Sequence, residues 1–201
     1  MRGHIRVGRA MLASALLALA AGSAWAAPEV LVAVGSTLGV TGSPGSGGAS
    51  ASFGVLWPLS ERFAFGATLS ADDLGTGLGV LHDPNTGLEL GTVATTHRWS
   101  YGGEWRGEAR LYESHRARLL WGAGFGWGHQ EQDRRAQVLD TVSGIVASTG
   151  ATFLLKASHG HSFGTTVAWK RAFVHHASDP DRSTSWATAA VEWRWKGTPR
   201  E

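Results

Sequence analysis

Residues 119–128 have the sequence Leu-Leu-Trp-Gly-Ala-Gly-Phe-Gly-Trp-Gly, in which two kinds of side chain alternate. Successive side chains of a β-strand point to opposite faces. The odd-numbered positions therefore place leucine, tryptophan, alanine and phenylalanine on one face, and the even-numbered positions place almost only glycine on the other. The stretch predicts a strand with one apolar face and one nearly bare face, and its glycine content disfavours a helix.

The same alternation recurs elsewhere in the chain. Small or polar side chains alternate with apolar ones in 50–57, and 186–195 repeats the pattern with Trp193 and Trp195 on its apolar face. Strand and turn signals together predict eight strands. They cover residues 29–40, 49–58, 63–71, 100–112, 118–128, 150–158, 162–174 and 184–196.

The connections between these strands alternate in length. Short turns are expected at 58–62, 113–117 and 159–161, whereas the longer connections are 41–48, 72–99, 129–149 and 175–183. Short turns on one rim and long loops on the other are typical of up-and-down barrels. The predicted fold is therefore all-β, an eight-stranded antiparallel barrel with both chain ends on the short-turn rim.

Alternation alone leaves open which face points inward, since a secreted soluble β-domain would bury its apolar face. Two observations favour a membrane-spanning barrel. The second face is rich in Gly, Ala, Ser and Thr, which suits a narrow lumen. Aromatic residues also gather near the predicted strand ends, as in the girdles of membrane barrels. They are Trp57, Phe63, Phe163, Trp193 and Trp195 near the short turns, and Tyr101, Trp127 and Phe173 near the other rim.

Residues 1–26 have the composition of a secretory signal peptide. Three arginines precede an apolar run of about a dozen residues, too short for the roughly 20 of a spanning helix. Cleavage is expected after Ala26, with Ala24 as the second small residue of the site, which leaves 27–201 as one domain. Three of the 18 basic residues lie in the leader, so 15 remain against 16 acidic ones, a balance that argues against a nucleic-acid partner. Cysteine is absent.

Over about 29–196, the chain resembles the small eight-stranded outer-membrane β-barrel proteins. The resemblance implies contact with outer-membrane lipids, insertion by the barrel-assembly machinery, and a role in envelope integrity or surface interaction. We expect a monomer without a cofactor. Such proteins commonly end on an aromatic residue, whereas six residues follow Trp195 in this chain.

The fourth predicted strand carries charges on the face opposite its apolar residues. Charges buried in a lumen persist only when they are paired and hydrogen-bonded. We therefore predict a non-enzymatic barrel plugged by a salt-bridge network, with a narrow ion path as the alternative and no open channel. The predicted network consists of Glu104, Arg106, Glu108, Arg110, Lys156, Lys170, Glu192 and Arg194.

The histidines show no spacing typical of a metal site, and the sequence predicts neither a metal ion nor a catalytic centre. One stretch suggests an alternative, because His176 and Ser178 resemble the His-x-Ser pair of the outer-membrane lipid A deacylases, which would imply an esterase. Asp179 stands where that family has asparagine, and Ala190 stands where its acidic residue is expected.

Overall fold

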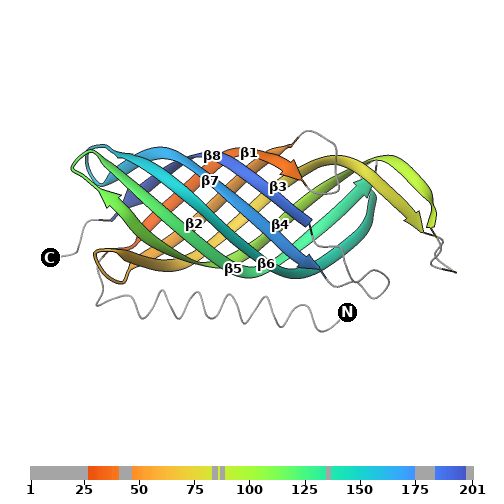
Figure 1. Cartoon of the computed structure of the whole chain (residues 1–201), viewed down its shortest axis with the longest axis horizontal. Coiled ribbons are helices and arrows are strands. Elements are labelled where there is room, and N and C mark those ends of the chain that lie inside the picture. The colour runs from red at the N-terminus through yellow and green to blue at the C-terminus, as the bar shows by residue number, and fades with distance from the viewer. Residues whose placement is uncertain are drawn as a thin grey trace.

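The computed structural model describes residues 27–40, 47–82, 86, 89–134, 137–174 and 184–197. These residues form a barrel of eight strands (Figure 1). The strands are β1 (Glu29–Val40), β2 (Ala49–Pro58), β3 (Phe63–His82), β4 (Glu89–Glu113), β5 (Ala117–Arg134), β6 (Gln137–Lys156), β7 (His161–Val174) and β8 (Thr184–Lys196).

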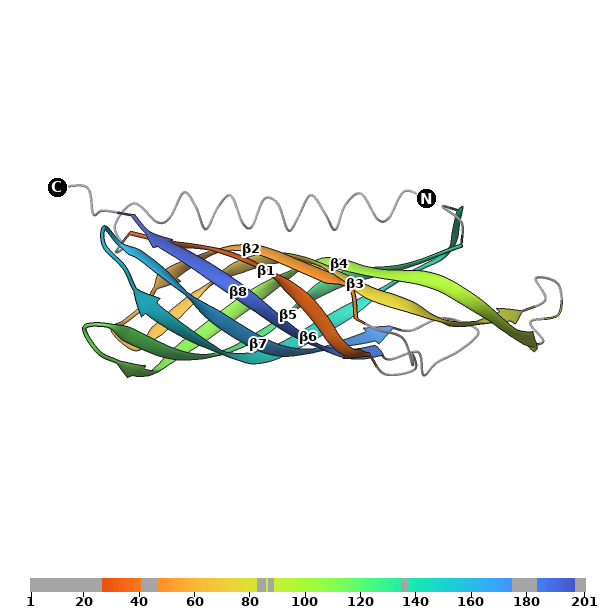
Figure 2. The same cartoon turned by 90° about the horizontal axis from the view of Figure 1, so that it is seen from above.

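Every strand pairs antiparallel with the next one, and β1 pairs with β8 to close the sheet. The closing register brings Val34 opposite Val191 and Ala33 opposite Glu192. Figure 2 shows the tilt of the strands around the closed wall. Closure leaves no unpaired edge along the wall, and the predicted fold class is confirmed.

The short turns lie at 59–62, 114–116 and 157–160, on the rim where β1 starts and β8 ends, as predicted (Figure 1). We call this end the short-turn rim. Ser60 and Ser114 stabilise two of the turns, since their hydroxyls accept the N–H groups of Phe63 and Ala117 at 3.1 and 3.0 Å. In the third turn, Gly160 has φ 78°, and a Cβ there would lie 2.7 Å from the Lys196 carbonyl oxygen.

Four strands are longer than predicted at the opposite end, the far rim. The expected loop 72–99 is strand up to His82 and again from Glu89, and the expected loop 129–149 is strand up to Arg134 and again from Gln137. These predictions were wrong because polar residues interrupt the apolar alternation, at Asp72 and Asp73 in the first stretch and across 129–134 in the second. Beyond the barrel wall, two strands can pair through their backbones without an apolar face, and Figure 1 shows β3 and β4 running on together past β1 and β8.

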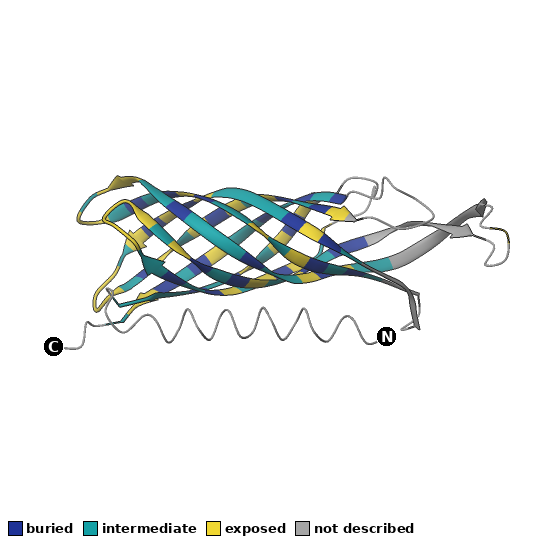
Figure 3. Cartoon of the chain, turned by 90° about the horizontal axis from the view of Figure 1, so that it is seen from below, coloured by how far each residue is buried: buried dark blue, intermediate teal, exposed yellow. Residues whose placement is uncertain are grey.

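The two faces of the wall differ in the way predicted for a membrane barrel. Large apolar side chains cover the outside, with Phe125 63% and Val191 65% exposed, and Figure 3 shows exposed and buried residues alternating along the strands. Among the described residues, 17 of the buried side chains are polar or charged and nine are apolar. This is the reverse of a water-soluble domain, in which the large apolar side chains would be inside.

No helix among the described residues is long and apolar enough to cross a membrane.

Candidate functional site

The lumen is the candidate site, and its charges depend on the bare face of β5. A Cβ at Gly122 would lie 3.2 Å from Arg106 Nε, and one at Gly124 would lie 2.8 Å from Glu104 Oε2. Both glycines neighbour β4 in the sheet register. The alternating glycines of β5 therefore leave the space that the long charged side chains of β4 occupy.

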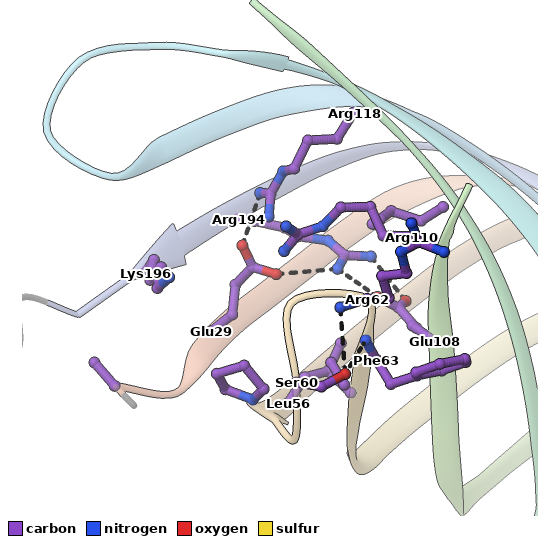
Figure 4. A pocket seen from close by; sticks show the side chains of 14 residues that line it. Glu29, Leu56, Ser60, Arg62, Phe63, Glu108, Arg110, Arg118, Arg194 and Lys196 are labelled. Atoms are coloured by element: carbon purple, nitrogen blue, oxygen red, sulfur yellow. Dashed lines mark hydrogen bonds and ion pairs between the residues drawn. The ribbon is translucent and has the colours of Figure 1, made fainter. Parts of the chain in front are cut away.

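Arg194 is the centre of the largest group of charges (Figure 4). Its two terminal nitrogens donate to both oxygens of Glu108 at 2.6 and 2.8 Å, a bidentate pair across the lumen from β8 to β4. Its Nε donates to Glu192, and Nη1 also donates to Glu29 at 3.2 Å. Arg194 and Glu192 are each only 1% exposed, so the attraction between them is screened little by water.

Two further arginines complete this group. Arg118 Nη2 lies 2.7 Å from Glu29 Oε1 and donates to the Ser162 hydroxyl at 3.0 Å. Arg106 Nε lies 2.9 Å from Glu108 Oε1. Three arginines thus face three glutamates, which matches the pairing that buried charges require. We call the group the Arg194 cluster, and it comprises Glu29, Arg106, Glu108, Arg118, Glu192 and Arg194.

A smaller group lies at the short-turn rim itself. Glu113 pairs with Arg110 and accepts a hydrogen bond from Lys156. Partial burial alone would raise the pKa of Glu113, but the hydrogen bond from Lys156 and the positive charge of Arg110 outweigh burial and lower it below its ordinary value. The carboxylate therefore stays charged beside its two partners at neutral pH.

A separate ion pair lies toward the far rim. Asp72, 1% exposed, accepts hydrogen bonds from Lys170 Nζ at 2.8 Å, Ser50 Oγ at 2.6 Å and Trp186 Nε1 at 3.1 Å. These four residues come from β3, β7, β2 and β8. We call them the Asp72 group. Trp186 also packs in an apolar cluster with Leu74, Val146 and Ala172.

The predicted network residues are thus divided among several places. Arg106, Glu108, Glu192 and Arg194 come together in one cluster, whereas Arg110 and Lys156 meet at Glu113, and Lys170 meets Asp72. Glu104 stands apart, 8% exposed, and accepts a hydrogen bond from Ser148.

Sequence reasoning missed four partners, namely Glu29, Asp72, Glu113 and Arg118. Strand parity could have found three of them. Asp72 continues the lumen-facing positions of β3, and Glu29 and Arg118 occupy lumen-facing positions at the first residues of their strands. Asp72 falls in the predicted loop 72–99 because the apolar alternation of β3 is interrupted after Ala71.

The predicted signal peptide, with Ala24 and Ala26, lies outside the described residues, and so do His176 and Ser178. The structure brings a different serine and histidine together on the outer surface, where Ser143 Oγ lies 2.6 Å from His129 Nδ1. Tyr101 stacks on His129 and donates to Glu131. Within the described ranges no carboxylate hydrogen-bonds the His129 ring, so this pair lacks the orienting acid of a triad. In the same ranges, no three potential ligands gather for a metal ion.

Comparison with solved structures finds proteins of similar fold. The crystal structure of Neisserial surface protein A superposes with a TM-score of 0.60 at 9% identity, over 85% of this chain and 96% of that one. The chain has the fold of a small outer-membrane β-barrel. At this identity, the likeness concerns the outer-membrane barrel fold alone.

Two further structures with the outer-membrane barrel fold are more distant. The N-terminal β-barrel domain of Pseudomonas aeruginosa OprF gives a TM-score of 0.47 at 11% identity, over 85% of this chain and 98% of that domain. Ail, the attachment invasion locus protein of Yersinia pestis, gives 0.45 at 12%, over 85% and 99%. No protein-family model matches the chain, and no curated protein matches its sequence.

Proposed function

We propose that the protein is a monomeric outer-membrane barrel, exported by residues 1–26 and inserted by the barrel-assembly machinery. The apolar outer face supports this location, because only lipid makes that face favourable without a partner. Short turns usually face the periplasm in such barrels. This places the short-turn rim on the periplasmic side of the membrane and the β3–β4 extension on the extracellular side.

We propose further that the lumen is sealed and that the barrel is not an enzyme. The proposal of a sealed lumen rests on the bidentate Arg194–Glu108 pair, which joins opposite walls of the lumen where both side chains are buried. An eight-stranded barrel has an interior that side chains can fill, and a second closure lies at the Asp72 group. The protein then acts through its surface, in envelope integrity or in contacts made by the strand extensions at the far rim.

A permeability measurement tests the seal. The purified protein is reconstituted in liposomes loaded with a small charged dye, and dye release is compared with that from protein-free liposomes and from liposomes with an open porin. We expect release at the protein-free rate. Rapid release by folded protein would contradict the sealed lumen and favour the ion path.

Location is tested separately by separating the two membranes of expressing cells on a density gradient. We expect the protein in the outer-membrane fraction, resistant to carbonate washing. Recovery in the soluble periplasmic fraction would contradict membrane insertion and favour a soluble β-domain.

A further inference from the structure

A cavity of about 40 Å³ opens at the short-turn rim, next to the Arg194 cluster (Figure 4). One water molecule needs a cavity volume of roughly 10–15 Å³, so this cavity holds about three waters or one small polyatomic ion. Exposed residues such as Ser60, Arg62 and Lys196 line its mouth, and buried residues such as Glu108 and Arg194 line its floor. A solute can therefore reach the buried charges from the short-turn rim.

Positive charge exceeds negative charge in the lining. The basic residues are Arg62, Arg110, Arg118, Arg194 and Lys196, and the acidic ones are Glu29 and Glu108. The charged neighbours that contact this lining add two basic and two acidic groups, so the excess of three positive charges remains. They are Arg106, Lys156, Glu113 and Glu192.

Both glutamates of the lining are already ion-paired, although the Oε1 atom of Glu29 accepts no hydrogen bond. Glu108 is held by Arg194 and Arg106, and Glu29 is held by Arg194 and Arg118. In the part of the chain that the structure describes, the side chains of Arg62 and Lys196 make no ion pair. The mouth thus carries two cationic side chains that no carboxylate among the described residues neutralises.

A buried donor in the lining also lacks an acceptor. Arg118 is 8% exposed, and its Nη2 is used by Glu29 and Ser162, but its Nε has no hydrogen-bond partner. A buried N–H without an acceptor is unfavourable, because its hydrogen bond to water is lost and not replaced. An oxygen of a bound solute would supply the missing acceptor.

We propose that this cavity binds a small oxyanion with more than one negative charge, of which phosphate is the prototype. The planar guanidinium groups match the oxygens of phosphate, and the lysine at the mouth adds a mobile positive charge. The cavity size admits a phosphate group, and the charge excess disfavours a cation. The bound group is either free phosphate or the phosphate of a lipid headgroup on the side of the membrane that the short-turn rim faces.

The proposal is tested by titrating inorganic phosphate into the detergent-solubilised barrel at constant ionic strength, with binding heat as the readout. Arg62→Gln and Lys196→Gln remove the two unpaired charges at exposed positions, so the barrel wall is left intact. Loss of one charge-assisted hydrogen bond weakens binding by about tenfold or more. We expect one site in the wild type and this weakening in each variant, with electrophoretic mobility before heating used to confirm that the variants fold.

Arg116→Gln is the matched control, because Arg116 is an exposed arginine on the neighbouring turn that does not line the cavity. Its affinity for phosphate should equal that of the wild type. Glycerol 3-phosphate is titrated in parallel, and tighter binding than inorganic phosphate identifies a lipid headgroup as the source. No binding at millimolar phosphate, or equal weakening by Arg62→Gln and Arg116→Gln, would overturn the proposal while leaving the barrel and its location untouched.

Discussion

The two ends of the lumen hold their buried charges by different means. Near the short turns, Arg194 meets three carboxylates, and an open cavity reaches two of them, Glu29 and Glu108. Toward the far rim, Asp72 meets one lysine and two neutral donors beside an apolar cluster. We therefore expect the loss in free energy of unfolding, when a side chain is removed, to grow with the number of buried charges that lose their partner. This number is larger at the Arg194 cluster than at the Asp72 group.

The largest effect is expected from Arg194→Met. The change leaves Glu108 and Glu192 buried with too few partners, which costs about 3–5 kcal/mol. The free energy of unfolding is measured by urea titration of the protein in lipid vesicles. Arg116→Met is the control and should stay within about 0.5 kcal/mol of the wild type. A cost below about 1 kcal/mol would show that water, and not Arg194, compensates the glutamates.

Lys170→Met tests the other end. Asp72 would lose its counter-charge but keep the hydrogen bonds from Ser50 and Trp186. The expected cost is about 3 kcal/mol, at the lower end of the range for Arg194→Met, because one buried carboxylate loses its counter-charge but keeps two hydrogen bonds. The same urea titration applies. If Lys170→Met proves the more destabilising of the two, the proposed difference between the ends is wrong.

Trp186→Phe should have a smaller effect at the same end. It keeps an aromatic ring in the apolar cluster and removes only the N–H that Asp72 accepts at 3.1 Å. We expect about 1 kcal/mol. Combined with Lys170→Met, it should cost more than the two single changes added together, because Asp72 then keeps only Ser50. Strict additivity in that double-mutant cycle would show that Trp186 and Lys170 do not share Asp72.

The smallest effect is expected at the rim, from Glu113→Gln. The lowered pKa of Glu113 means that its ion pairs stabilise the fold above the ordinary carboxyl pKa and that this contribution is lost as the pH falls through the lowered value. The rim is solvated, so the cost at neutral pH is at most about 1 kcal/mol. Wild type and variant should converge in stability in acid, as measured by unfolding between neutral pH and about pH 3. A gap that persists in acid would assign the effect to packing and not to charge.

Much of the wall could be predicted from the sequence, because alternation is a local property. The alternation in 119–128 places the apolar face and the bare face of β5 correctly, and the bounds predicted for β1, β2 and β8 match the structure. Which charges meet depends on strand register and on the curvature of the closed sheet. The Arg194–Glu108 pair joins strands that are not neighbours in the sheet, so no local sequence pattern predicts this contact.

The strand ends at the far rim and the Asp72 group were not predicted, for a related reason. The apolar alternation is interrupted at Asp72 and Asp73, although the backbone ladder between β3 and β4 continues. Hydrogen bonds between main chains carry no side-chain signature, so the interruption indicates the end of a strand even though apolar residues alternate with glycine again in 74–80. The role of Asp72 follows only after the strand is known to continue.

The most direct test of the account is electrophoresis of the detergent-extracted outer-membrane protein, loaded with and without boiling. A closed sheet without a free edge resists SDS until it is heated. We predict a fast-migrating band in the unheated sample that moves to a slower position after boiling. A protein recovered without detergent, with the same mobility before and after heating, would contradict the membrane barrel.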